Sequence, residues 1–318
     1  MNNFGNKLNF LFCFDNNYKI QGMVSIFSLL DNIDEKINIF IIYNENKLND
    51  YIPSKIKNHN NLNSLKIYKF EDNNYDFPNI KNVHVTSATY YRMFIEKYLP
   101  PQINEVVYLD ADTICINNPI DSINAKLKNL KESEFLLAAN TEHHINENIE
   151  PEKFIRLNLN KSYFNAGVLI IDLEKWRKQN FTIKLLNTMK ILGNKVLQWD
   201  QDILNSVING SYIELEEELN FNSNKLKNHT QKNILFVHFI GSKKPWNTSG
   251  AFNFGSNYYH NNFYKIYSKH YHITHKWKTA SVKETLEAIT TLKILKLDFP
   301  IKYLKYFILS LRNNKKVL

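Results

Sequence analysis

Val106–Thr113, which reads VVYLDADT, places two acidic side chains directly after a short apolar run. The run predicts a buried strand over Glu105–Leu109, with Asp110 and Asp112 just past its end. Residues two apart on extended backbone point the same way, and Ala111 between them is small enough to leave room. Both carboxylates can therefore face one site. Oxygen ligands at a strand end suit a hard divalent cation, Mn²⁺ or Mg²⁺, although Asp-x-Asp alone occurs often by chance.

Apolar runs and helical spacings alternate on both sides of this stretch. The predicted strands are Leu8–Phe14, Lys36–Tyr43, Leu65–Phe70, Glu134–Ala139, Val168–Asp172 and Ile234–Phe239. The predicted helices are Ile20–Leu30, Thr86–Tyr98, Leu173–Leu192 and one that Asp200 can cap. This alternation predicts an α/β domain with a mostly parallel sheet. Ligands of such sheets bind at the carboxyl ends of strands, where Asp15 and Asp110 both fall.

Bulk composition narrows the class of protein. The chain has 318 residues and 43% hydrophobic content, enough for one large domain or two small ones. The N-terminal apolar run is short and stops at Asp15, so we interpret it as a first strand and not as a signal peptide. No run reaches about 18 uninterrupted apolar residues, so we expect no transmembrane helix.

Cysteine and histidine usage argues against a structural metal site. The two cysteines, Cys13 and Cys115, have no CxxC neighbour, so they predict neither a disulfide framework nor a zinc site. Four histidines near the C-terminus lack a cysteine or another matching partner, and we expect structural or surface roles for them: His260, His270, His272 and His275.

The net charge of +9 favours an anionic partner, and its location narrows the choice. Seven Lys or Arg residues and a single acid, Asp298, lie between Lys293 and Leu318. This distribution indicates a basic tail on an ordinary enzyme body, so we expect no nucleic-acid partner.

The segment His238–Trp246, HFIGSKKPW, also follows an apolar strand. Gly241 permits a close backbone approach, and Lys244 supplies a positive charge that a diphosphate needs. His238 can complete a metal site as a neutral imidazole. A surface turn with an incidental histidine explains this segment equally well when it is taken alone.

Two further polar segments are weaker when each is taken alone. Asn165 and Gly167 stand just before the predicted strand Val168–Asp172, where amides can hold sugar hydroxyls. In the segment QWDQD (198–202), an acid at a helix start is usually structural. A turn leading into a core strand and a helix cap are therefore the simpler interpretations.

Together and in this order, these motifs resemble family 8 retaining glycosyltransferases, most closely those that add galactose or glucose to bacterial lipooligosaccharide and lipopolysaccharide. The motifs are FCFDNNY (12–18), TYYR (89–92), VVYLDADT (106–113), YFNAGVLIIDLEKW (163–176), WDQDILN (199–205) and HFIGSKKPW (238–246). The resemblance implies the A-type glycosyltransferase fold, a Rossmann-like, mostly parallel sheet flanked by helices, with a helical, basic C-terminal extension. Residues 1–250 would form the nucleotide-sugar-binding catalytic domain, and residues 251–318 an aromatic stretch and basic tail.

The resemblance implies a nucleotide site at the first strand. Cys13 and Asp15 match positions that hold uracil and ribose, with Asn17 nearby. Arg92 matches a basic residue that contacts the donor, and Ala111 lies with the nucleotide-sugar.

The resemblance also implies a metal–diphosphate site. Asp110, Asp112 and His238 match the three protein ligands of Mn²⁺. Gly241 and Lys244 match the residues that cradle the diphosphate.

On the sugar side, the resemblance places Asn165 near the donor sugar and both Asp200 and Gln201 around the reacting anomeric carbon. His84 falls where an acceptor contact is seen. Two features depart from the family pattern. The segment AANTE (138–142) lacks the Asp that relatives often carry, with Glu142 as its nearest acid, and Phe14 replaces a small residue beside the uracil pocket.

The C-terminal tail predicts an amphipathic helix after Pro300. Its apolar face would carry Ile301, Leu304, Phe307, Ile308 and Leu311, and its basic face Lys302, Lys305 and Arg312, with Leu309 interrupting the polar side. Such a helix is typical of attachment to an anionic membrane surface. A helix packed on the body remains the alternative.

The sequence therefore predicts a retaining, Mn²⁺-dependent hexosyltransferase that uses UDP-galactose or UDP-glucose. Its acceptor would be a lipid-linked saccharide, and its place the cytoplasmic side of the bacterial inner membrane, as a peripheral protein. A non-catalytic, membrane-attached sugar-binding protein remains an alternative. A sugar-phosphate nucleotidyltransferase is a weaker one, because FCFDNNYKIQG lacks the Gly-rich loop expected for a nucleoside triphosphate.

Overall fold

A computed structural model describes residues 7–71, 75–78, 86–145, 148–226 and 233–312. Within these residues, seven strands form the main sheet in the order β3-β2-β1-β4-β7-β6-β8, and β5-β10-β9 form a small second sheet. The strands are β1 (Asn9–Phe14), β2 (Ile37–Tyr43), β3 (Leu62–Lys69), β4 (Glu105–Leu109), β5 (Thr113–Cys115), β6 (Leu137–Thr141), β7 (Phe164–Asp172), β8 (Ile213–Glu214), β9 (Phe221–Asn222) and β10 (Phe236–His238).

Helices connect the strands and extend the chain at its C-terminal end. The α-helices are α1 (Lys19–Asp31), α2 (Leu48–Tyr51), α3 (Ser54–Lys57), α4 (Ile95–Tyr98), α5 (Ile120–Glu132), α6 (Pro151–Leu157), α7 (Leu173–Lys178), α8 (Phe181–Leu192), α9 (Trp199–Ile208), α10 (Thr248–Ala251), α11 (Ser256–Tyr267), α12 (Lys278–Thr290) and α13 (Pro300–Arg312). The 3₁₀ helices are η1 (Asn16–Tyr18), η2 (Ser87–Phe94), η3 (Gly193–Lys195), η4 (Glu217–Asn220), η5 (Ser223–Lys225) and η6 (Lys293–Lys296).

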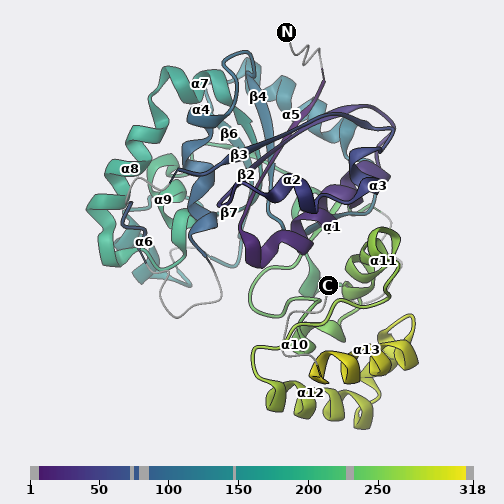
Figure 1. Cartoon of the computed structure of the whole chain (residues 1–318). Helices are drawn as coiled ribbons and strands as arrows, with labels where there is room; N and C mark the ends of the chain where they lie inside the picture. The colour runs from purple at the N-terminus through teal and green to yellow at the C-terminus, as the bar shows by residue number, and fades with distance from the viewer. Residues whose placement is uncertain (1–6, 72–74, 79–85, 146–147, 227–232, 313–318) are drawn as a thin grey trace.

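The main sheet is mostly parallel, which confirms the predicted fold class. Strand β1 pairs in parallel with β2 and β4, whereas β7 runs antiparallel between β4 and β6. Alternate residues of β1 point to opposite faces: Phe10 and Phe12 pack in one apolar cluster, and Leu11 packs in another. Helices cover both faces of the sheet (Figure 1), which fits a strand that is apolar without alternation from Phe10 to Phe14.

The two sheets together bring the polar motifs to one edge. Residues Phe12 and Leu109 are register partners in β1 and β4, so Asp15 and Asp110 follow neighbouring strand ends. Strand β5 begins directly after Asp112 and runs antiparallel to β10, with His238 opposite Thr113. This pairing carries His238 next to the acids across more than a hundred residues of sequence.

Two predicted elements differ from the structure, a strand and a helix. Strand β7 begins at Phe164 and not at Val168, because Phe164 and Asn165 pair with the end of β6 past a register shift. Asn165 and Gly167 therefore lie inside a strand, which corrects their predicted position before it. The predicted helix Leu173–Leu192 is broken at Asn180, whose φ of 50° begins a second helix.

The segment Thr86–Tyr98 also differs from the single helix that the pattern predicts. It forms the 3₁₀ helix η2 followed by one turn of α4, with Thr86 as the predicted cap accepting from the Ala88 amide.

Near the C-terminal end, the helices α10, α12 and α13 pack around a separate, smaller apolar cluster, which lies at the bottom of the molecule in Figure 1. The predicted apolar face of the last helix is correct in part: Phe307, Leu304 and Leu311 pack on this cluster, but Ile301 and Ile308 do not. Tyr303, Phe307 and Ser310 are buried, whereas Ile301 is 83% exposed and Ile308 51%. The buried stripe is set by Phe252, whose ring lies 5.1 Å from that of Tyr303. None of the helices in the described part of the chain is long and apolar enough to cross a membrane.

Candidate active site

A cavity of about 1160 Å³ opens at the carboxyl ends of β1 and β4. Most of the predicted site residues line it: Cys13, Asp15, Arg92, Asp110, Ala111, Asp112, Asn165, Asp200, Gln201, His238, Gly241 and Lys244. Asn17 is not part of this lining, and its side-chain amide donates to the Asp15 carboxylate at 3.1 Å. His84 lies outside the described residues.

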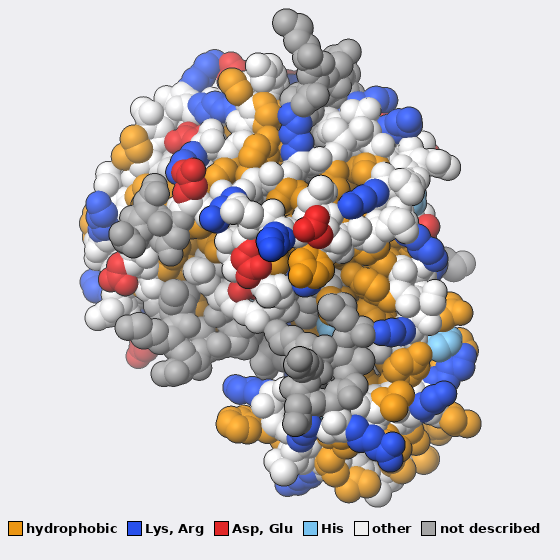
Figure 2. Space-filling model, viewed as in Figure 1, with side chains coloured by type: hydrophobic (Ala, Val, Ile, Leu, Met, Phe, Trp, Pro, Cys, Tyr) orange, Lys and Arg blue, Asp and Glu red, His pale blue; other side chains and the backbone are white. Residues whose placement is uncertain are grey.

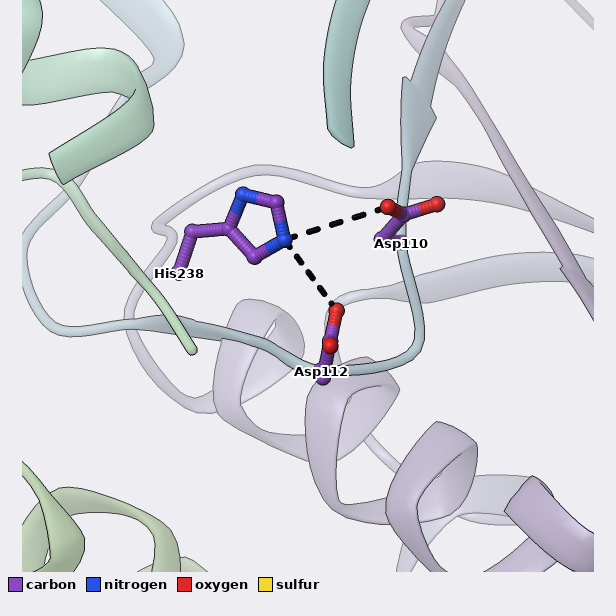
Figure 3. Close-up of side chains that lie close together, drawn as sticks. All are labelled: Asp110, Asp112 and His238. Atoms are coloured by element: carbon purple, nitrogen blue, oxygen red, sulfur yellow. Dashed lines mark ion pairs between the residues drawn. The ribbon is translucent and has the colours of Figure 1, made fainter. Parts of the chain in front are cut away.

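Asp110, Asp112 and His238 converge on one point of the cavity wall (Figure 3). The Nε2 atom of His238 lies 3.3 Å from Asp112 Oδ1 and 3.8 Å from Asp110 Oδ2. The ligand atoms of the three residues all lie within 4.8 Å of one another. Two carboxylates and an imidazole at this spacing are a donor set that fits Mn²⁺ or Mg²⁺.

A chain of hydrogen bonds fixes which nitrogen of His238 faces the acids. The Gly167 amide donates to Asn165 Oδ1 at 2.9 Å, and Asn220 Nδ2 donates to the same oxygen at 3.0 Å. Asn220 Oδ1 must then accept, and it lies 2.9 Å from His238 Nδ1. The Nδ1 atom therefore carries a proton, and Nε2 is the nitrogen that faces the two carboxylates. Sequence reasoning missed Asn220, since no motif marks it.

Gly167 is required by close packing against the same imidazole. A Cβ atom at this position would lie 2.1 Å from His238 Cε1, so any side chain would displace the ring. The motif YFNAG contains this glycine, but the need for a glycine there is explained only by the contact between β7 and β10.

Arg92 contacts both Asp200 and the cluster formed by Asp110, Asp112 and His238. Its guanidinium is buried, with Nε 2.5 Å from Asp200 Oδ2 and Nη1 3.3 Å from Asp110 Oδ1. Thr89 Oγ1 donates to Asp200 Oδ1 at 2.6 Å. Burial raises the pKa of Asp200 to about 6, even though Arg92 and Thr89 both favour its charged form.

The predicted capping role of Asp200 is wrong. Asp200 lies in the first turn of α9 and turns its carboxylate to Arg92 and Thr89. The amides before the helix are held by Asp202, which accepts from Leu197 N at 2.8 Å and Gln198 N at 2.9 Å. The buried arginine outcompetes the local amides because an unpaired charge in the interior is costly.

Lys244 reaches from the loop after β10 into the same cluster. Its ammonium group contacts Asp112 Oδ2 and lies 2.6 Å from the Phe239 carbonyl oxygen. Burial alone would raise the pKa of Asp112, but Lys244 and His238 hold it well below its ordinary value. Gly241 adopts a φ of 81°, a left-handed conformation that favours glycine in the bend of this loop.

The far side of the cavity is lined by amides. Gln201 Oε1 accepts from the Ala166 amide at 3.0 Å, and its Nε2 donates to the Tyr163 hydroxyl at 3.2 Å. Asn165 Nδ2 donates to Glu142 Oε1 at 2.8 Å. Glu142, the nearest acid in the segment that departs from the family pattern, therefore faces the cavity beside Asn165.

The first strand supplies the opposite wall. Burial raises the pKa of the Cys13 thiol well above its usual range, which keeps it neutral. The bulky Phe14 ring packs on Tyr43, with ring centroids 5.6 Å apart, and fills the space beside Gly22.

Residues 9–250 match the family model described as Glycosyl transferase family 8. A Haemophilus influenzae protein that is named provisionally as a glycosyltransferase is 31% identical over 249 residues, which cover 75% of this chain and 73% of the relative. The lipopolysaccharide 1,2-glucosyltransferase of Escherichia coli strain K12 is 28% identical over 256 residues, covering 75% and 72%.

Among solved structures, the galactosyltransferase LgtC in complex with donor and acceptor sugar analogues is similar to this chain. The two superpose with a TM-score of 0.67 at 20% identity, covering 86% of this chain and all of the other. This likeness shows a shared fold.

Proposed function

The chain belongs to glycosyl transferase family 8, and from that premise we propose that it is a retaining hexosyltransferase. It moves galactose or glucose from a UDP-sugar onto a saccharide acceptor in lipooligosaccharide, lipopolysaccharide or surface-glycan biosynthesis. The observation that carries this proposal is the convergence of Asp110, Asp112 and His238 beside Lys244 in the cavity wall. The cavity is large enough for a nucleotide-sugar.

The same three residues are the proposed ligands of a divalent cation, Mn²⁺ or Mg²⁺. When bound, such a cation stabilises the negative charge of a departing nucleoside diphosphate. Lys244 lies on the same side of the cavity and adds a positive charge for that diphosphate. Cys13, Asp15 and Arg92 line the cavity, which supports their proposed roles in contacts with uracil, ribose and the donor.

We propose that the acceptor attacks on the same face from which UDP departs, with the leaving phosphate oxygen taking the acceptor's proton. A double displacement would need a free nucleophile under the sugar. The Asp200 carboxylate is engaged by Arg92 and Thr89, which weakens it as a nucleophile. Gln201 carries an amide, which is a poor nucleophile. Trapping a glycosyl adduct on Asp200 would disprove this mechanism.

The proposed lipid-linked acceptor has support at the C-terminal end. Nine large apolar side chains between Trp277 and Leu309 are exposed. Exposed basic residues lie among them: Lys276, Lys278, Lys283, Lys293, Lys302, Lys305 and Arg312. Figure 2 shows hydrophobic and basic side chains, orange and blue, gathered on the lower lobe. This surface fits peripheral attachment to an anionic membrane, at the cytoplasmic face of the bacterial inner membrane.

The test is release of UDP from a panel of UDP-sugars, with and without Mn²⁺. We expect turnover with UDP-galactose or UDP-glucose that depends on Mn²⁺ and falls roughly 10³-fold in Asp112→Asn, because several kcal/mol of charge stabilisation are lost. The matched control is Asp121→Asn, which removes an exposed acid at the start of α5. Turnover that is indifferent to both metal and Asp112, or no turnover with any sugar, would defeat the proposal.

A further inference from the structure

Lys244 occupies a position that a simple diphosphate contact does not explain. Its side chain is 9% exposed, and its ammonium group contacts Asp112, one of the proposed metal ligands. The Phe239 carbonyl oxygen, 2.6 Å away, holds the same group in place. Although Lys244 lines the cavity, its ammonium group is therefore held by Asp112 and the Phe239 carbonyl oxygen.

The two oxygens of Asp112 have different partners. Its Oδ2 atom contacts Lys244, whereas its Oδ1 atom lies 3.3 Å from His238 Nε2. The carboxylates of Asp110 and Asp112 repel each other, because both are negatively charged. Lys244 is the positive group that contacts Asp112 directly, so it balances part of the charge that a bound cation would balance.

The same ammonium group opposes a cation that enters this site. A divalent ion between Asp110, Asp112 and His238 would share the Asp112 carboxylate with Lys244, and two like charges on one buried carboxylate repel strongly. Release of Lys244 from Asp112 removes that repulsion. The lysine has a flexible four-carbon stem, and its loop, with Gly241, lines the cavity where a diphosphate is expected.

We propose that Lys244 is an internal counter-cation that couples metal binding to nucleotide binding. Without nucleotide it neutralises Asp112 and weakens the site for a divalent cation. An arriving diphosphate draws the ammonium group away, and the cation then binds to the freed carboxylate. This inference rests on the proposed function, since it needs a diphosphate ligand in the cavity.

The test measures Mn²⁺ affinity by the electron paramagnetic resonance signal of free Mn²⁺, with and without UDP. For the unmodified chain we expect weak binding alone and binding at least about tenfold tighter with UDP, a difference of roughly 1.4 kcal/mol. Lys244→Gln keeps a donor for Asp112 and Phe239 but removes the charge. It should bind Mn²⁺ alone about tenfold more tightly, and the gain from UDP should shrink.

Two further variants keep the test decisive. Lys243→Met removes an exposed positive charge from the neighbouring position of the loop and should leave both affinities unchanged. Lys244→Arg keeps the charge, so it should bind Mn²⁺ alone no more tightly than the unmodified chain does, and this expectation holds even where Lys244→Gln folds poorly.

The proposal is overturned when Lys244→Gln binds Mn²⁺ alone no more tightly than the unmodified chain, or when Lys244→Arg binds it more tightly. Failure of the proposed function gives a different result, in which the unmodified chain binds neither UDP nor Mn²⁺ under any condition.

Discussion

Charged groups are paired in one region of the molecule and exposed in another. The first region is the buried charge cluster around Asp110 and Asp112, and the second is the C-terminal surface over α12, η6 and α13. In the cluster, Arg92, Lys244 and His238 each lie against a carboxylate, and most of these groups are buried. On the C-terminal surface, basic side chains lie in solvent beside exposed apolar ones such as Ile301.

This contrast shows what holds each region together. Charge in the interior is tolerated only when it is paired, so the cluster is bound by partners from β4, η2, α9 and the loop after β10. The C-terminal surface needs none of its exposed side chains for packing, because Tyr303 and Phe307 form its small core. Changes in the cluster should therefore affect folding and ligand affinity together, and changes on the surface only its external contacts.

The largest effect should follow loss of the buried arginine. Arg92→Met leaves the carboxylates of Asp110 and Asp200 without their shared partner, so we expect the free energy of unfolding to fall by about 3–5 kcal/mol. Lys97→Met, which breaks the exposed pair with Glu71, is the control and should leave the melting temperature nearly unchanged. If both variants lower the melting temperature equally, buried and exposed charge pairs do not differ in their contribution to stability.

The next effect concerns His260 of α11, whose Nε2 atom lies 3.0 Å from the carbonyl oxygen of Pro245, the residue after Lys244. Burial lowers the pKa of His260 to about 3. Above pH 6.5 the histidine is neutral in both states, and stability is complete. As the pH falls from 6.5 toward 3, His260 binds a proton in the unfolded chain but not in the folded chain. The free energy of unfolding therefore falls by about 1.4 kcal/mol per pH unit.

Denaturant unfolding at pH 7 and pH 5 measures this loss. His260→Gln should remove about 2 kcal/mol of the difference between the two pH values. His144→Gln, at an exposed histidine, is the control. A pH dependence that His260→Gln leaves intact would show that other groups carry it.

A further effect should appear at the hydrogen-bond chain behind His238. Asn220→Ala removes the acceptor of the Nδ1 proton, so the imidazole no longer has a single tautomer. We expect Mn²⁺ affinity to fall by about 10–100-fold, which a metal titration without nucleotide would measure. Asn224→Ala, at an exposed asparagine of η5, should bind metal normally. Normal affinity in both variants would mean that Asn220 only packs against the ring.

The smallest effect concerns the C-terminal surface. The double variant Leu295→Glu/Ile301→Glu should reduce binding to vesicles that contain anionic lipid by roughly tenfold, with UDP-sugar hydrolysis unchanged. Ile155→Glu/Ile191→Glu is a matched control, because these side chains are each 81% exposed on the body. Vesicle binding that is the same in both double variants would end the membrane proposal.

Local patterns predicted β1, β2 and β4 well because an apolar run makes up most of each of these strands, whereas the bounds of β3, β6, β7 and β10 differ from the predictions. Strand β4 has the predicted bounds, and β1 and β2 each begin one residue later than predicted. The tail helix was located correctly, but only Leu304, Phe307 and Leu311 of its predicted apolar face pack inward, since helical spacing permits several apolar stripes. Phe252 and Tyr271, more than thirty residues earlier in the chain, decide which stripe is covered.

By itself, the sequence determined the α/β class, the two acids at a strand end and the motifs that identify the family, because these depend on residues close together in the chain. Only the tertiary structure decided three features: the proton position on His238, the partner of Asp200 and the contact of Lys244 with Asp112. Each is a pairing between groups from separate elements in a buried site. A polar group there takes whichever partner the packing brings within reach, and no local pattern encodes that partner.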